Sequence, residues 1–189
     1  METPNSFGIV VNNPNYVLPG GKGHNFQTVF SVCFDFPDEN LELHWNGLIL
    51  NCSYKYEVPQ MIYDVLDTLR ALAGSEEGTH KLNFGMDTVC TDWDLSWKGE
   101  HLVIRSNWEW AHFGKGMKEA LNERAELVTT TTHFMREWHK LVELLVRIIK
   151  RSRLKIGDWH YSPAYLAETN ALISQKLGLT VAGTKNRKA

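Results

Sequence analysis

The chain has 189 residues, 43% of them hydrophobic, and its formal net charge is −2. This size and composition are typical of one globular domain with a well-buried core. No apolar run approaches the roughly 20 residues that span a bilayer, and no secretory signal pattern opens the chain, so we expect a cytosolic protein. Three cysteines that form no CxxC pair argue against a disulfide scaffold or a zinc ribbon: Cys33, Cys52 and Cys90.

The first part of the chain predicts strands. A short strand is expected at residues 7–12, and another at residues 28–36, which are rich in β-branched and aromatic side chains. Residues 41–45 alternate between apolar and polar side chains, as a half-buried strand does. Asn46-Gly47 predicts a type I′ hairpin turn, because that turn needs positive φ at both central positions. The apolar residues of the returning strand, 48–56, should share one buried face.

A helix and a second hairpin follow. Apolar residues recur at helical spacing from Pro59 to Gly74, and the strand pattern resumes at residues 81–87. Residues 93–110 then repeat the sequence pattern of the first hairpin. In this repeat Leu43, Trp45 and Gly47 correspond to Leu95, Trp97 and Gly99. On the return strand of this second hairpin, four residues are expected to face the core: Leu102, Ile104, Trp108 and Trp110.

The last third of the chain is predicted to be mainly helical. Residues 111–125 are compatible with a short helix or a loop, and residues 126–132 favour a strand because threonines are poor helix formers. A long amphipathic helix begins near Phe134, and the basic residues in its last turns complement the helix dipole. Ser162 is a suitable N-cap for a final helix that ends at Gly178.

These elements predict an α+β fold in a single domain covering residues 1–189. The expected architecture is an antiparallel sheet built from a duplicated ββββα unit, with the first unit at about residues 7–78 and the second at about 79–152. An extra C-terminal helix is expected at about residues 162–178. Helices should cover the apolar face of the sheet and leave the other face in contact with water.

Charge is distributed unevenly along the chain. Residues 35–109 carry 14 acidic and 5 basic side chains, a net charge of −9, whereas residues 110–189 carry 7 and 14, a net charge of +7. Such an asymmetry is informative about binding partners rather than about the fold. The basic residues between Lys140 and Lys155 could bind nucleic acid, although compensation of the helix dipole already explains them.

No catalytic, metal-binding or nucleotide-binding signature is present in the sequence. The patterns GxSxG, GxGxxG, GxxxxGK[ST] and HExxH are all missing, so we expect neither an enzyme nor a bound metal or cofactor. The strongest alternative is general acid–base catalysis by Asp92 and Asp94, which lie on one strand face. The same alternation with Trp93 and Leu95 is expected of an ordinary solvated face.

The polar side of the predicted sheet is the candidate binding surface. A surface with an excess of carboxylates would attract a basic partner and steer its approach. Strand parity directs His44 and the five residues that we assign to partner binding away from the core: Glu42, Asp92, Asp94, Arg105 and Glu109.

Three features give the chain a resemblance to a known class of proteins. They are the tryptophan-rich hairpins of the form L-x-W-x-G at residues 43–47 and 95–99, the helix FMREWHKLVELL at residues 134–145, and the two-faced charge pattern. In these features the chain resembles the small cytosolic immunity proteins of bacterial toxin–immunity systems, including contact-dependent growth inhibition. The resemblance implies a non-enzymatic protein that binds a toxin domain, often a basic nuclease, and occludes it, with no small-molecule or membrane partner.

A second resemblance supports an alternative function. The ββββα order is similar to the Whirly single-stranded nucleic-acid-binding architecture, which implies a nucleic-acid-binding module that uses the basic second half. The basic Lys-Gly-Lys-Ala-Ala-Leu motif of that family is not matched, since residues 115–121 read KGMKEAL.

Overall fold

A three-stranded antiparallel sheet forms the first part of the fold. The computed structural model describes residues 6–18, 20–23, 26–34, 39–156 and 162–179. The strand order is β1 (Phe7–Val10), β3 (Asn40–Trp45), β4 (Leu48–Ser53). Asn46 and Gly47 connect β3 to β4 with φ angles of 45° and 80°, which confirms the predicted turn.

A four-stranded antiparallel sheet forms the second part. Its strands follow chain order: β5 (Glu77–Gly85), β6 (Val89–Lys98), β7 (His101–Ala111) and β8 (Glu126–Thr130). The predicted second hairpin is β6–β7, and the alternate residues Trp93, Leu95 and Trp97 are buried as expected. One side of the sheet therefore belongs to the core and the other side lies at the surface.

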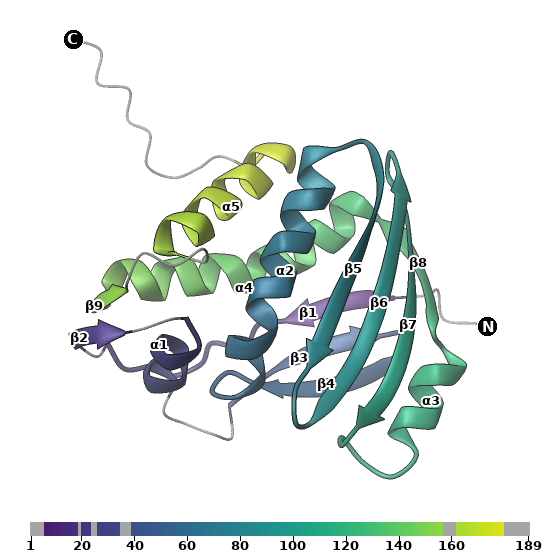
Figure 1. Cartoon of the computed structure of the whole chain (residues 1–189), viewed down its shortest axis with the longest axis horizontal. Helices are drawn as coiled ribbons and strands as arrows, with labels where there is room; N and C mark the ends of the chain where they lie inside the picture. The colour runs from purple at the N-terminus through teal and green to yellow at the C-terminus, as the bar shows by residue number, and fades with distance from the viewer. Residues whose placement is uncertain (1–5, 19, 24–25, 35–38, 157–161, 180–189) are drawn as a thin grey trace.

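Helices pack around these sheets, as Figure 1 shows. The structure describes α1 (Phe26–Cys33), α2 (Glu57–Gly74), α3 (Met117–Glu123), α4 (Thr131–Arg151) and α5 (Pro163–Lys176). A two-stranded parallel pairing joins β2 (Gly20–Gly23) to β9 (Arg153–Ile156). The α+β class and the C-terminal helix are thus confirmed, and residues 117–123 adopt the short-helix alternative.

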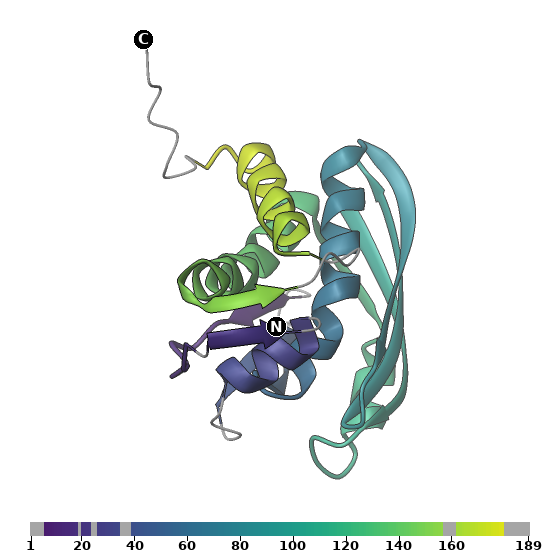
Figure 2. The same ribbon diagram turned by 60° about the vertical axis from the view of Figure 1, so that its left-hand side comes forward.

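The core lies between the four-stranded sheet and the elements behind it. In Figure 2 this sheet is one outer layer, with α2 against its inner side and α4 and α5 on the far side of α2. Trp45 of β3 meets Trp93 of β6, with 4.7 Å between the ring centroids, and meets Trp108 of β7 at 5.7 Å. The tryptophans of the two hairpins therefore join the sheets through aromatic contacts.

The strand predicted at residues 28–36 was wrong, since residues 26–33 form helix α1. Its apolar side chains follow a helical spacing, and Phe30 and Phe34 are both buried. Residues 35–36 lie outside the described residues. The first predicted unit consequently contains a helix where the second contains a strand. The strands of the two units also form separate sheets. The duplicated ββββα unit is therefore not confirmed.

Two aromatic residues predicted to be buried are exposed. Trp110 is 38% exposed because the register shifts between Cys90 and Thr91, where Thr91 pairs with Trp108 and Cys90 with Trp110. Glu109 is therefore the extra residue of a β-bulge, which turns Trp110 toward the surface. Tyr56 is 53% exposed because β4 has already ended at Ser53 and Tyr56 caps α2.

The two ends of α5 follow the prediction closely. The Ser162 hydroxyl accepts a hydrogen bond from the backbone N–H of Tyr165, as expected of an N-cap. At the other end Gly178 has a φ of 66°, and the N–H of Leu179 donates to the carbonyl of Ser174. This Schellman arrangement ends the helix at Lys176, two residues before the predicted glycine.

Candidate interaction surface

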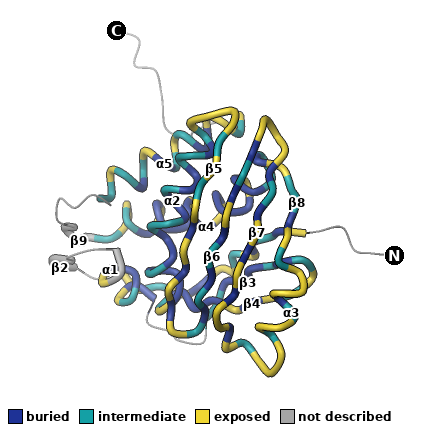
Figure 3. Tube along the Cα trace, turned by 45° about the vertical axis from the view of Figure 1, so that its right-hand side comes forward, coloured by how far each residue is buried: buried dark blue, intermediate teal, exposed yellow. Residues whose placement is uncertain are grey.

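The candidate surface is the side of the four-stranded sheet that points away from α2 and the three-stranded sheet, called here the outer face. Figure 3 shows buried and exposed residues alternating along β5, β6 and β7. On β6, for example, Trp93 and Leu95 are buried while Asp94 between them is exposed. The period-2 alternation of side chains along a strand therefore creates the outer face.

Charged side chains of both signs occupy the outer face. By register and alternation it carries five acidic and three basic residues: Glu77, Lys81, Asp92, Asp94, Lys98, Arg105, Glu109 and Glu126. The outer face is therefore only mildly acidic, in contrast to the net charge of the segment 35–109 that supplies most of it.

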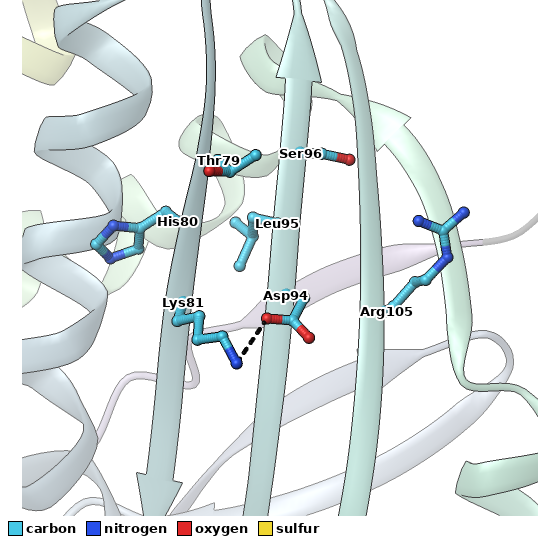
Figure 4. A pocket seen from close by; sticks show the side chains of 7 residues that line it. All are labelled: Thr79, His80, Lys81, Asp94, Leu95, Ser96 and Arg105. Carbon is cyan, nitrogen blue, oxygen red and sulfur yellow. Dashed lines mark ion pairs between the residues drawn. The ribbon is translucent and has the colours of Figure 1, made fainter.

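A row of alternating charges crosses the whole sheet. Lys81, Asp94, Arg105 and Glu126 are neighbours in register on β5, β6, β7 and β8. The Lys81 Nζ lies 3.2 Å from an Asp94 carboxylate oxygen, as the dashed line in Figure 4 marks, and an Arg105 guanidinium nitrogen lies 2.9 Å from Glu126. Because these side chains are more than half exposed, the pairs add little stability.

A shallow depression lies beside this row. Its volume is about 400 Å³, and Figure 4 shows the short side chains of Thr79 and Ser96 next to the longer charged ones. The complete lining consists of Thr79, His80, Lys81, Asp94, Leu95, Ser96 and Arg105. The outer face is thus uneven in shape as well as charged, and both properties favour recognition of another protein surface.

The end of the outer face nearest the β5–β6 turn is different, because its carboxylates form no ion pair within the described residues. Asp92 accepts a hydrogen bond from the Asn83 amide, and Glu109 accepts one from the Cys90 thiol over 3.5 Å. Burial raises the pKa of Cys90, and the hydrogen bond to Glu109 and the charges of Glu109 and Asp92 raise it further. Cys90 is therefore a neutral thiol and a poor nucleophile.

The structure brings four of the five predicted binding residues together. Asp92, Asp94, Arg105 and Glu109 all lie on the outer face. Glu42 does not, because β3 belongs to the other sheet and Glu42 lies on the side of β3 opposite the buried Leu43 and Trp45. Its carboxylate is 2.9 Å from His44 Nε2. The prediction that Glu42 shares a surface with the others was wrong.

Four outer-face residues were missed by the sequence prediction. Glu77, Lys81, Lys98 and Glu126 form ion pairs on this face, two of them with predicted residues. Lys81 and Glu126 were placed at the very ends of predicted strands, and β5 in fact begins at Glu77. The alternation that located Asp94 would have found Lys81 as well, once this boundary was known.

The alternative acid–base pair lies along one strand and does not converge on an enclosed pocket. Asp94 is paired with Lys81 and Asp92 with Asn83, so each carboxylate contacts a different residue of β5. Trp93, which lies between them in sequence, points into the core. In the described part of the chain, no three His, Cys, Asp or Glu side chains are placed to hold a metal ion together.

A second charged surface lies on α4. Most of this helix is buried, and its exposed residues form a narrow stripe that is basic except for Glu143: Arg136, Lys140, Arg147, Lys150 and Arg151. Lys140 is paired with Glu137 at 2.6 Å, and Arg151 donates to the Tyr16 hydroxyl. The side chains of residues 153–155, also part of the predicted basic segment, lie outside the described residues.

None of the helices within the described ranges combines the length and the apolar character that a membrane span requires. Comparison of the chain with protein-family models, with curated proteins and with solved structures finds no match in any of the three.

Proposed function

We propose that this protein is a cytosolic immunity protein, which binds a cognate bacterial toxin domain and neutralises it by occlusion. The toxin would be a nuclease of the kind used in contact-dependent growth inhibition. The proposed binding residues on the outer face are Asp92, Asp94, Arg105 and Glu109, and the protein acts without catalysis or a cofactor. The observation that carries the proposal is the outer face itself, a wide side of a four-stranded sheet that no other described element covers.

The rigidity of the sheet supports this proposal. The inner side is anchored by buried tryptophans, and the charged side chains of the row on the outer side are paired across neighbouring strands. A surface whose side chains are held in place loses less conformational entropy when a partner binds. Occlusion by such a surface needs no group in a reactive state, only close contact with the toxin.

The charge of the outer face supports a basic partner. Its five carboxylates outnumber its three basic side chains, and two of the carboxylates, Asp92 and Glu109, form no ion pair within the described residues. A nuclease presents a positive groove to the phosphates of its substrate, and a mildly negative surface is complementary to such a groove. Association should therefore weaken as the salt concentration rises.

Co-expression tests the proposal. The toxin domain encoded beside this protein is expressed with the wild type, with Thr79→Arg or with Gln175→Arg, and cell growth and co-purification are measured. Thr79 is exposed at the depression, whereas Gln175 is exposed on α5, so both variants place an arginine side chain and its charge on the surface, but at different locations. We expect Thr79→Arg to lose protection and Gln175→Arg to retain it. Absence of protection by the wild type would overturn the proposal.

The exposed basic stripe of α4 favours one alternative, a single-stranded nucleic-acid-binding module. Arg136 and Arg147 lie about three turns apart along the exposed side of the helix, and Lys150 lies about one turn beyond Arg147, so a phosphate backbone could contact all three. A gel shift with a single-stranded oligonucleotide at low salt, compared with the Arg136→Gln/Arg147→Gln variant, distinguishes the two functions. The immunity function predicts no shift with either protein.

A further inference from the structure

Trp110 is unlike the other described tryptophans. Trp45, Trp93, Trp97, Trp108 and Trp138 are at most 5% exposed, whereas Trp110 is 38% exposed. It lies near the end of β7, directly after Glu109, and its register partner Cys90 is two residues before Asp92 on β6. Tryptophan is one of the residue types enriched among binding hot spots.

The backbone and one hydrogen bond fix the orientation of this ring. The β-bulge at Glu109 places Trp110 opposite Cys90, and the indole N–H donates to the carbonyl oxygen of Met86 over 3.1 Å. The ring thus reaches from β7 to the turn that follows β5. Because bulge and hydrogen bond hold the indole in place, a partner does not have to order it on binding.

Glu109 and Asp92 both lie near the thiol of Cys90. Cys90 is the register partner of Trp110, its thiol donates to Glu109, and the charges of both Glu109 and Asp92 act on that thiol. Cys90 therefore marks a small area bordered by one aromatic ring and two carboxylates. An ammonium or guanidinium group is attracted both by the face of an indole ring and by carboxylates.

We propose that Trp110, Asp92 and Glu109 form a receptor for one arginine or lysine side chain of the bound toxin. This inference rests on the proposed function and adds the chemistry of one contact with the toxin. The row formed by Lys81, Asp94, Arg105 and Glu126 does not serve this role, because its carboxylates are already paired with basic residues of the same sheet.

A titration followed by nuclear magnetic resonance tests the receptor without the toxin. The probe is a hexa-arginine peptide at low salt, with a hexa-glutamate peptide as the control. We expect the Trp110 indole N–H signal, assigned with the Trp110→Phe variant, to shift with hexa-arginine and to stay in place with hexa-glutamate. An unchanged Trp110 signal, or equal shifts along the whole outer face, would overturn the inference.

Substitutions separate the contribution of the Trp110 ring to hexa-arginine binding from the contribution of the two carboxylates. Asp92→Asn/Glu109→Gln should weaken hexa-arginine binding about fivefold, whereas Glu77→Gln, at the carboxylate paired with Lys98, should leave it nearly unchanged. Trp110→Leu should weaken binding about threefold, and Trp110→Phe should weaken it less because it keeps an aromatic face. Equal losses for the leucine and phenylalanine variants would contradict a role of the ring in binding the cation.

The same variants in the co-expression assay distinguish the receptor from the proposed function. If Thr79→Arg abolishes protection while Trp110→Leu and Asp92→Asn/Glu109→Gln retain it fully, the receptor inference is wrong and the immunity function stands. If hexa-arginine binds at Trp110 but the wild type inhibits no toxin, the immunity function is wrong and the site remains a receptor for basic side chains. Loss of protection in both sets of variants supports both proposals.

Discussion

The carboxylate of Glu137 accepts a hydrogen bond from the backbone N–H of Ile9 over 2.8 Å, although the two residues are 128 positions apart. Ile9 is in β1, which among the described residues is an edge strand of the three-stranded sheet. Two more side chains of α4 bond to the same edge, since His133 Nε2 donates to the Phe7 carbonyl over 2.7 Å and Lys140 reaches the Ile9 carbonyl at 3.4 Å. Helix α4 therefore satisfies backbone groups that a further strand would otherwise bind.

Removing this contact should destabilise the protein. In Glu137→Ala the N–H of Ile9 loses its acceptor in a buried position and Lys140 loses its ion pair, so we expect the free energy of unfolding to fall by about 2 kcal/mol. Urea denaturation measures the change. The control is Arg136→Ala, an exposed neighbour on the same helix, which should change the stability by less than about 0.5 kcal/mol. Similar values for both variants would contradict the edge-capping role.

Gly78 on β5 is directly opposite Trp97 on β6, and a Cβ atom at Gly78 would lie 2.6 Å from the Trp97 ring. The indole cannot move away freely, because its N–H donates to the Ser75 carbonyl over 3.1 Å. Gly78→Ala should therefore lower the free energy of unfolding by about 1–3 kcal/mol through overpacking. Thermal and urea denaturation would measure this loss.

Gly74 provides a matched control with the opposite expected sign. It is the last residue of α2, and a Cβ atom there meets no atom within 4 Å. Gly74→Ala should raise the free energy of unfolding by about 0.5 kcal/mol, because alanine restricts the unfolded chain and favours the helix. If both alanine variants were stabilising, close packing of the Trp97 ring on Gly78 would be ruled out.

Asn46 joins the first hairpin to the second half of the chain. Its side-chain amide donates to the carbonyl oxygens of Arg124 and Glu126, while its backbone holds a positive φ of 45°. Asn46→Ala loses both hydrogen bonds and strains the turn, so it should cost about 2 kcal/mol of folding stability. Asn46→Gly should cost less, since glycine tolerates positive φ and loses only the hydrogen bonds. Equal losses in denaturation experiments would exclude the strain contribution.

His139 connects α4 to α5 in a buried position. Its Nε2 lies 3.0 Å from the Ser174 hydroxyl oxygen, whose own hydrogen is donated to the Asn170 carbonyl. The His139 ring nitrogen is therefore the donor in this contact. Burial lowers the pKa of His139 below its ordinary value of 6.5, although the charge of Glu143 and a hydrogen bond with Asn170 oppose the shift.

Folding stability should consequently depend on pH through His139. In the unfolded chain His139 takes up a proton as the pH falls through about 6.5, whereas in the folded protein it stays neutral to a lower pH. Lowering the pH therefore favours unfolding until His139 of the folded protein is protonated as well. Between about pH 7.5 and about pH 5 the wild type should lose more stability than His139→Gln, which keeps a donor but does not titrate. Equal losses in the two proteins would show that His139 is not the titrating group.

Sequence patterns were sufficient wherever the structure depends on neighbours in the chain. Alternation predicted β3, β4, β6 and the first part of β7. The Asn46-Gly47 pair predicted a turn, and the hydroxyl of Ser162 predicted a helix cap. The same patterns were insufficient at residues 28–34, where strand propensity was outweighed by burial of Phe30 and by contact of the Phe34 ring with Tyr54 at 5.0 Å. Local preference is a weak guide when long-range packing favours another conformation.

For the candidate surface, too, some features follow from the sequence and others only from the tertiary structure. The sequence by itself determined that Asp92, Asp94 and Arg105 point away from the core, because successive side chains of a strand alternate in direction. Only the tertiary structure decided that Glu42 belongs to another sheet, that Glu126 pairs with Arg105, and that a bulge exposes Trp110. Strand order, the pairing of β7 with β8 and the bulge depend on contacts between residues distant in the chain, and no local pattern encodes them.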